Sequence, residues 1–363
     1  MRKTRLILIG GFLGAGKTTL MARAASRMVA RGLKVGLITN DQAAGLVDTQ
    51  IARGVTDSVR EVAGGCFCCK FGDLVAALKD VFREFTPDVV LAEPVGSCTD
   101  LAATVLRPLR AYYSEMLDIA PYSALVDPAR LREALAETST LLSDNVRYIL
   151  LKQIEEADLI VLNKCDLLTQ AEIAELTRLA DARFPGRRLL AISALRDADA
   201  DVWLDAVFGS IDAPGRIVDV DYDAYADGEA ELGWLNATVE LCGRPDEDWA
   251  AFVRDFLARV RDKLAAEPAE IAHLKAFLES GSGGLRGNVT SLKGEPQLAG
   301  SCAPSAGPLR FLVNARVAAS PDAVKAIVEQ ALTAARPTVR ARVVSLEHFR
   351  PGRPEPVHRF KAE

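Results

Sequence analysis

The feature that most constrains this chain is a glycine-rich run close to its start, Gly11-Phe-Leu-Gly-Ala-Gly-Lys-Thr-Thr. The run matches the phosphate-binding loop pattern, with glycine at both required places and Lys-Thr following. The preceding residues 6–9 are apolar, as in a buried strand, and residues 18–30 have a helical pattern. Glycines let backbone N–H groups surround phosphate oxygens, and a helix N-terminus adds positive potential. The sequence therefore predicts a nucleotide-phosphate site between a strand and a helix.

Two side chains of this loop have distinct expected roles. Lys17 would reach the β- and γ-phosphates, and the Thr18 hydroxyl would ligate Mg²⁺. The other nucleotide contacts that we expect from the loop are Gly11, Gly14, Ala15, Gly16 and Thr19.

Short apolar runs alternate with longer amphipathic stretches over the first 210 or so residues. The runs are rich in Val, Ile and Leu and barely alternate, as expected of strands buried on both faces of a parallel sheet. The predicted strands are 6–9, 34–39, 89–92, 123–126, 159–162 and 189–192, and the predicted helices are 18–30, 74–85, 129–136, 144–157 and 171–183. This order predicts an α/β domain over residues 1–211, the doubly wound, mainly parallel sheet of a P-loop NTPase.

The character of the sequence changes after this domain. Residues 212–232 hold seven acidic side chains against one arginine and predict an acidic, partly extended linker. Residues 233–348 predict a smaller α+β domain with the ferredoxin-like order β-α-β-β-α-β. Its predicted elements are strand 234–241, helix 246–264 with more helix through 278, strands 287–292 and 309–316, helix 323–335 and strand 338–346. Residues 349–363, with three prolines, predict an extended tail.

Composition excludes several classes of protein. The chain of 363 residues is 49% hydrophobic and 26% charged, which is typical of a globular protein rather than a disordered one. Its net charge of −5 gives no support for nucleic-acid binding. No run approaches the roughly 20 apolar residues of a membrane span, and the basic start followed by an uncharged run lacks a signal peptide's cleavage site. We therefore expect a cytoplasmic protein with no membrane partner.

The nucleotide is indicated by a second motif. Asn163, Lys164 and Asp166 form an Asn-Lys-x-Asp tetrad directly after a predicted strand, at the edge where open α/β sheets bind ligands. A carboxylate there can accept hydrogen bonds from the N1–H and N2 amino groups of guanine, which adenine lacks. Ser193 and Ala194 follow the next strand, where a backbone amide could meet the guanine carbonyl. The tetrad favours GTP, although a polar turn that caps a helix has the same pattern.

Two acidic residues at strand ends are candidates for a magnesium site. Glu93 follows a buried strand, and an acid at this place in a P-loop protein usually touches Mg²⁺ or its water shell. Asp41 follows another strand, and Gly96 would free a backbone N–H to sense the γ-phosphate. We expect Lys17, Thr18, Glu93 and Asp41 to form the catalytic group, the last three around Mg²⁺; Glu93 and Asp41 could instead be loop or cap residues.

Three of the seven cysteines fall within four residues, as Cys66, Cys68 and Cys69. An odd number of clustered cysteines fits a reduced compartment and metal or redox chemistry better than a disulfide framework. Three thiols at this spacing can converge on one transition-metal ion. Cys66 and Cys69 also form a C-x-x-C pair, so a redox dithiol and plain buried cysteines remain alternatives, and Cys98 could join the site.

These motifs together resemble those of the CobW-like GTPases, relatives of the accessory GTPases that insert nickel into urease and hydrogenase. The resemblance rests on the phosphate loop, the Gly-Cys-x-Cys-Cys run with Asp73-Leu74, Glu93-x-x-Gly96, Val126-Asp127, Gln153 and Asn163–Asp166. It implies a metal-binding GTPase that uses GTP and Mg²⁺ and delivers Zn²⁺, Co²⁺ or a related ion to a client protein. The family's thiol site falls on Cys66, Cys68 and Cys69. The C-terminal half resembles the family's smaller domain by element order more than by motif.

The chain also departs from the family pattern. Asn40-Asp41-Gln42-Ala43-Ala44 stands where the family often has Asn-Glu-Phe-Gly-Glu, and Val95 stands where a threonine is common. Only three histidines are present, whereas many members carry a histidine-rich loop. A histidine-based metal reservoir is therefore not expected.

The position of the thiols between two candidate switch loops suggests a mechanism. The γ-phosphate and Mg²⁺ would order both loops and tighten the metal site, and hydrolysis would release the ion to a client that meets the C-terminal domain. No arginine finger or catalytic glutamine is recognisable, so we expect slow intrinsic hydrolysis, raised by a homodimer or a client. Two other functions stay open: a GTP-gated thiol-redox or metal-sensing switch, and a P-loop small-molecule kinase.

Overall fold

The structure is a computed structural model that describes residues 3–42, 47–56, 58–136, 143–209, 215–267, 269–281 and 283–362. Two compact units make up the chain. The first comprises Met1–Gln42, Ile51–Gly228 and Arg353–Glu363, and the second comprises Ala43–Gln50 and Glu229–Gly352. No helix in the described ranges is long and apolar enough to cross a membrane.

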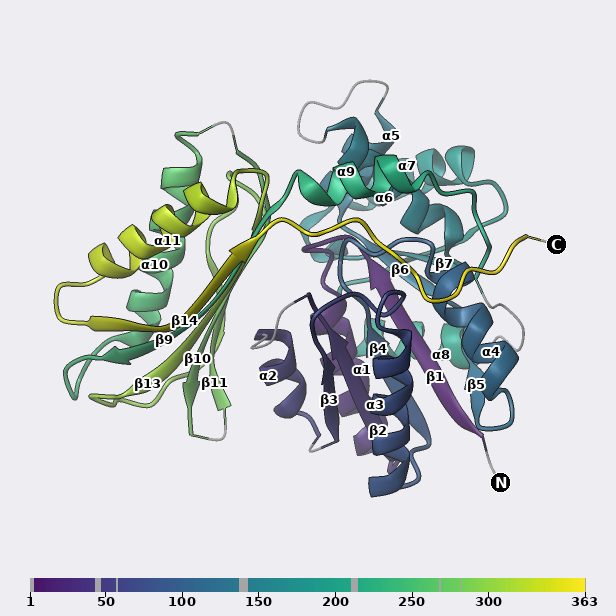
Figure 1. The fold of residues 1–363 in the computed structure, drawn as a ribbon, viewed down its shortest axis with the longest axis horizontal. Coiled ribbons are helices and arrows are strands. Elements are labelled where there is room, and N and C mark those ends of the chain that lie inside the picture. Colours follow the sequence, from purple (N-terminus) through teal and green to yellow (C-terminus); the bar gives the residue numbers. More distant parts are fainter. Residues whose placement is uncertain are drawn as a thin grey trace. The chain divides into compact units, whose positions relative to one another are not determined.

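The described residues of the first unit form an eight-stranded sheet whose pairings are all parallel (Figure 1). The strand order is β3-β2-β4-β1-β6-β7-β8, and β5 also pairs with β1. The strands are β1 (Thr4–Gly11), β2 (Val35–Asn40), β3 (Val59–Val62), β4 (Val89–Glu93), β5 (Leu117–Ile119), β6 (Ser123–Val126), β7 (Leu159–Leu162) and β8 (Arg188–Ala191). The predicted doubly wound parallel sheet is confirmed, and the two short strands β3 and β5 were not predicted.

Helices connect the strands of this sheet, as parallel pairing requires, and two further helices, α8 and α9, follow its last strand. They are α1 (Lys17–Ala30), α2 (Val47–Arg53), α3 (Phe71–Glu84), α4 (Arg107–Tyr113), α5 (Pro128–Leu135), α6 (Asp144–Glu156), α7 (Gln170–Arg183), α8 (Asp197–Phe208) and α9 (Tyr222–Ala230), with short helical turns at η1 (Ala102–Leu106) and η2 (Cys165–Leu167). Ile7 and Ile9 of β1 pack with Leu20, Met21 and Ala24 of α1 in a fully buried core. This packing fixes the start of α1 against the end of β1, which is where the phosphate loop lies.

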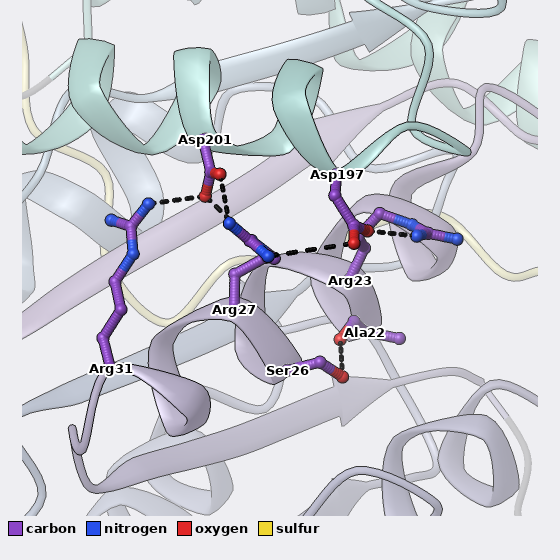
Figure 2. Close-up of polar contacts among 7 residues, drawn as sticks. All are labelled: Ala22, Arg23, Ser26, Arg27, Arg31, Asp197 and Asp201. Atoms are coloured by element: carbon purple, nitrogen blue, oxygen red, sulfur yellow. Dashed lines mark hydrogen bonds and ion pairs between the residues drawn. The ribbon is translucent and has the colours of Figure 1, made fainter.

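Charged side chains join α1 to α8 on the surface of the first unit (Figure 2). Arg23, Arg27 and Arg31 follow one another at four-residue spacing, so they lie on one face of α1. Asp201 accepts hydrogen bonds from Arg27 Nε at 3.0 Å and from Arg31 Nη2 at 2.5 Å, and Asp197 pairs with Arg23. Helix α8 was not predicted from the sequence.

The second unit contains a separate antiparallel sheet in the described residues, with the order β12-β11-β10-β13-β9-β14 (Figure 1). Its elements are β9 (Gly233–Cys242), α10 (Trp249–Leu264), β10 (Ile271–Ser280), β11 (Gly283–Val289), β12 (Gln297–Gly300), β13 (Leu309–Val317), α11 (Pro321–Ala334) and β14 (Arg340–Phe349). Phe252 and Phe256 of α10 stack edge-on against Phe311 of β13 at ring-centroid distances of 5.6 and 5.3 Å. The expected smaller α+β domain is therefore present, with helices packed on its sheet.

Two predictions for this half of the chain are wrong. The helix expected to continue through residue 278 is strand β10, because Leu274, Ala276 and Leu278 alternate into the core while the strand is paired on both edges. The ferredoxin-like order therefore gains strands, β10 and β12. Part of the stretch expected as a linker is helix α9, whose Tyr225 is fully buried; residues 212–214 of that stretch lie outside the described residues.

Candidate functional site

The phosphate loop leaves β1 at Gly11 and enters α1 at Lys17. Gly11, Gly14 and Gly16 have φ angles of 118°, 76° and 94°, a region that favours glycine. A Cβ at Gly11 would lie 2.1 Å from the Leu125 carbonyl oxygen, so a larger residue does not fit there. The glycines of the motif are therefore required by the backbone path of the loop, in which the Ala15 N–H donates to the Phe12 carbonyl oxygen at 3.2 Å.

The predicted magnesium ligands are only partly brought together. Thr18 Oγ1 donates a hydrogen bond to Glu93 Oε1 at 3.0 Å, and both side chains are buried. Asp41 follows β2, whose Thr39 is in register with Glu93 of the neighbouring β4, so both acids lie at the same sheet edge. Asp41 Oδ1 accepts a hydrogen bond from the backbone N–H of Gln42 at 2.6 Å. The structure thus pairs Thr18 with Glu93, and the role of Asp41 stays a prediction.

A second loop, after β4, contacts the phosphate loop. A Cβ at Gly96 would lie 2.9 Å from Lys17 Nζ, so the glycine gives the lysine the space that it occupies. Gln153 Nε2 of α6 donates hydrogen bonds to the carbonyl oxygens of Gly96 and Cys98, at 3.0 and 2.8 Å. These two hydrogen bonds hold residues 96–98, which run from the glycine beside Lys17 to Cys98. In the sequence, Gln153 stood out only as part of the resemblance to a family. Its side chain binds backbone carbonyl groups of a distant loop, and no local pattern in the sequence signals such a contact.

The guanine tetrad is tied to the phosphate loop by one asparagine. Asn163 Nδ2 donates to the Ala15 carbonyl oxygen at 2.8 Å, and Asn163 Oδ1 accepts from the Ala194 backbone N–H at 2.8 Å. Asn163 therefore joins three of the segments that were predicted to contact nucleotide.

The other members of the tetrad region surround this contact. Lys164 has a φ of 60° and its Nζ lies 2.6 Å from Asp127 Oδ2. Asp166 lies in the turn η2 with an exposed side chain, and the Ser193 backbone N–H donates to Asp199 at 2.6 Å. The carboxylate of Asp166 is thus exposed at this edge, and its contact with a guanine base stays a prediction.

The three clustered thiols converge. The Sγ atoms of Cys66 and Cys68 are 2.8 Å apart, those of Cys66 and Cys69 are 3.2 Å apart, and those of Cys68 and Cys69 are 3.8 Å apart. Cys66 and Cys68 are buried and Cys69 is partly exposed. Since zinc–sulfur bonds are about 2.3 Å, sulfurs in a tetrahedral site lie about 3.8 Å apart, and a small expansion of this cluster meets that geometry. The thiols therefore fit a transition-metal ion.

The protonation of the cluster also suits a cation. Hydrogen bonds from Cys68, Cys69 and Cys98 lower the pKa of the Cys66 thiol well below its usual value. Hydrogen bonding to Cys66 raises the pKa of Cys68, and it raises the pKa of Cys69 to about 11. Cys66 is thus the thiol whose ionisation its neighbours favour. Cys98 is buried, and hydrogen bonding with it contributes to the pKa shifts of Cys66 and Cys68, but the group of sulfurs that all lie within 4.8 Å of one another consists of Cys66, Cys68 and Cys69.

Asn40 holds the thiol loop in place. Its Nδ2 donates to the carbonyl oxygens of Val62 and Gly65 at 2.9 and 2.8 Å, and its Oδ1 accepts from the Phe67 backbone N–H at 2.9 Å. Asn40 is the last residue of β2, directly before Asp41. A residue at the sheet edge where the nucleotide is expected therefore also holds the thiol loop. The sequence offered only its position at a strand end as a signal for this function.

Comparison with known proteins identifies the first half of the chain. The family described as "CobW/HypB/UreG, nucleotide-binding domain" matches residues 5–189. The zinc-regulated GTPase metalloprotein activator 1 of Dictyostelium discoideum is 26% identical over 217 residues, 52% of this chain and 45% of that protein. The zinc chaperone YeiR of Escherichia coli is 29% identical over 168 residues, 46% of this chain and 48% of that protein. This chain thus spans about half the length of the curated relatives that it matches.

Two metal-bound proteins are among the solved structures to which this chain is similar. HypB from Helicobacter pylori in complex with nickel is 14% identical, covers 58% of this chain and 90% of its own, and has a TM-score of 0.41. Zn(II)-bound YjiA GTPase from Escherichia coli is 16% identical, covers 91% of this chain and 99% of its own, and has a TM-score of 0.35. With the family match over residues 5–189, the phosphate loop and the tetrad in place, the chain belongs to the CobW/HypB/UreG family.

Proposed function

We propose that this protein is a GTPase that couples GTP binding and hydrolysis to the delivery of Zn²⁺ or a similar transition-metal ion, such as Co²⁺, to a client metalloprotein. The observation that carries the proposal is the convergence of three thiols on a loop held by Asn40, at the same sheet edge as the nucleotide residues. The names of the zinc chaperones and the zinc-regulated GTPase among its relatives support a metal cargo.

The residues around the phosphate loop account for the nucleotide half of this function. Lys17 and the loop N–H groups would bind the phosphates, and Thr18 with Glu93 would hold Mg²⁺, which would neutralise charge that develops on the transferred phosphoryl group. Asp166 would select guanine. We expect slow hydrolysis by the isolated chain, increased by dimerisation or by the client.

Two short connections would carry nucleotide state to the thiols. Cys98 is two residues after Gly96, and Gln153 holds both of their carbonyl groups, so a γ-phosphate bound beside Gly96 would shift Cys98 against the cluster. Asn40 would transmit a rearrangement of the segment after β2 to Gly65 and Phe67. In the GTP state the sulfurs would close on the ion, and hydrolysis would relax them and release it.

Metal analysis of protein purified without added metal tests the proposal. Replacement of Cys66, Cys68 and Cys69 with Ala removes the proposed ligands, and the matched control replaces Cys242 and Cys302, which lie in the second unit. We expect the control to bind Zn²⁺ and Co²⁺ with thiolate charge-transfer absorption in the Co²⁺ form, and the triple variant to lose both. Equal metal content in the two variants would contradict a thiol site.

A thiol-redox switch is the second candidate, because the Cys66 and Cys69 sulfurs are only 3.2 Å apart. Titration of free thiols with and without Zn²⁺ separates the two functions. Protection of the thiols by Zn²⁺ supports metal delivery, whereas a reversible disulfide that forms equally with and without the metal supports redox switching.

A further inference from the structure

The end of the chain lies against the thiol loop of the first unit. Residues 353–362 form neither helix nor strand in the structure and appear in Figure 1 as the yellow trace across that unit. The Glu355 backbone N–H donates a hydrogen bond to Cys69 Sγ at 3.2 Å, and the Val357 backbone N–H donates to the Cys68 carbonyl oxygen at 3.0 Å. Alternate N–H groups of an extended chain point the same way, so this segment presents one edge to two of the thiol residues.

An ion pair anchors this segment beyond the thiols. Arg359 Nε donates to Asp100 Oδ2 at 2.6 Å, and the Tyr222 hydroxyl donates to the same oxygen at 2.9 Å. Asp100 is 0% exposed, and burial raises the pKa of its carboxyl while Arg359 opposes that rise. Because a buried carboxylate without its cation is costly, Arg359 holds the segment firmly. Asp100 is two residues after Cys98, so this anchor attaches to the loop that carries Cys98.

Ring contacts and a second ion pair also attach the C-terminal segment to the first unit, one on each side of Glu355 along the chain. The His358 ring packs edge-on against Phe71, the first residue of α3, at 4.9 Å between centroids, and it lies tilted against the Tyr112 ring at 5.4 Å. Arg353, at the other end of the segment, pairs with Asp223. The proline-rich composition of this segment keeps it extended and lowers the entropy that it loses on docking.

We propose that residues 353–360 are a strap that forms part of the thiol site: the strap covers Cys68 and Cys69, donates the Glu355 N–H to the Cys69 sulfur and restricts exchange of the bound ion. A backbone N–H stabilises a thiolate and orients it as an outer contact of a metal ligand. Transfer of the ion to an acceptor then requires the strap to lift. For the ion itself this inference rests on the proposed function, whereas the shielding of the thiols does not.

The test uses alkylation of the metal-free, reduced protein by iodoacetamide, with Cys69 and Cys302 followed separately by mass spectrometry. Glu355 precedes a proline and is already restricted to extended backbone, so Glu355→Pro removes its N–H with little change of conformation, and Glu355→Ala keeps the N–H. We expect Cys69 to react several-fold faster in a chain that ends at Gly352, because the strap no longer covers it. In Glu355→Pro the strap stays in place but the hydrogen bond that favours the reactive thiolate is lost, so Cys69 should react more slowly than in the unchanged protein. Glu355→Ala should match the unchanged protein. Equal rates at Cys69 in all four proteins would overturn the strap.

A second arm measures transfer of Zn²⁺ from the loaded protein to a chromogenic chelator. We expect the chain that ends at Gly352 and the Arg359→Ala variant to transfer the ion several-fold faster than the unchanged protein, while Glu355→Ala does not. Transfer at one common rate would overturn the role of the strap in exchange. Failure of every protein to bind Zn²⁺ would refute the proposed function, and the alkylation rates would still decide whether the strap shields Cys69.

Discussion

We expect a single side chain, Asp166, to select the nucleotide. In the proposed function its carboxylate accepts two hydrogen bonds from guanine, and each guanine donor left without a partner would cost about 1–3 kcal/mol. Replacement of Asp166 with Asn should therefore lower GTP affinity by about 100-fold or more, and it should raise affinity for xanthosine triphosphate, which carries a carbonyl in place of the amino group. Titration calorimetry with both nucleotides measures this change.

The matched control for this variant is Asp205→Asn, an exposed acid on α8, which should bind GTP as the unchanged protein does. Unchanged GTP affinity in Asp166→Asn would remove the tetrad from the base site. Preference of the unchanged protein for ATP would favour the kinase alternative instead.

Glu156 predicts a pH dependence of stability. Its carboxylate accepts a hydrogen bond from the Ala102 backbone N–H at 3.0 Å, yet burial raises the pKa of this carboxyl well above its ordinary value. The unfolded chain loses this proton at lower pH than the folded one, so the carboxyl's contribution to stability is complete below its unfolded pKa and is lost as pH rises toward its folded pKa.

Replacement of Glu156 with Gln should remove this loss. The free energy of unfolding of the unchanged protein, relative to Glu156→Gln, should fall by up to about 1.4 kcal/mol per pH unit above about pH 5. Chemical denaturation of both proteins over this range measures the difference. Parallel pH curves would show that Glu156 keeps its ordinary pKa in the folded state.

At the residue scale, the sequence predicted the side chains whose chemistry is local to a motif. Lys17, Thr18, Glu93 and Asn163 fall where strand, loop and helix order place them. Asn40 was not predicted as a clamp, because it binds the backbone of a loop more than twenty residues further along the chain, which no local spacing reports.

At the scale of elements, the ion pairs between α1 and α8 contribute to the stability of the fold, and this contribution can be measured separately (Figure 2). Hydrogen bonding to Arg27 lowers the pKa of Asp201, so this acid stabilises the folded chain above its ordinary pKa and less as pH falls. Replacement of Asp201 with Asn should lower the melting temperature slightly in low salt. The decrease should vanish near about 1 M salt, where charges are screened beyond about 3 Å. A decrease that is independent of salt would indicate packing instead of charge.

Elements with one clear periodicity were predicted, and those with mixed signals were not. The buried strands of the parallel sheet have continuous apolar runs that fit no surface helix. The prediction for β10 was wrong because Ile271, Leu274 and Leu278 also recur at helical spacing. Only the pairing of this segment on both edges shows that it is a strand and not a helix. Helix α9 was not predicted because the acidic composition of this stretch is typical of a solvated linker, whereas tertiary packing buries its Tyr225.

At the scale of the whole molecule, segments that are far apart in the sequence lie in contact in the structure. The thiol run and the C-terminal segment are separated by nearly three hundred residues, yet the Glu355 backbone N–H donates a hydrogen bond to the Cys69 sulfur within the first unit. The order of elements could predict the two sheets, but it could not predict that the tail returns to the first unit. Its Arg359–Asp100 pair is a long-range contact with no local signal.

The central claim is that nucleotide and metal binding are coupled through the thiol loop. Because coupling is reciprocal, GTP must strengthen metal binding by the same factor as metal strengthens GTP binding. The direct measurement is Zn²⁺ affinity, by competition with a chelator, in the presence of a non-hydrolysable GTP analogue and of GDP. We predict tighter Zn²⁺ binding with the analogue, by about tenfold or more, and a smaller difference in Cys98→Ala. Equal affinities with the two nucleotides would contradict the coupling.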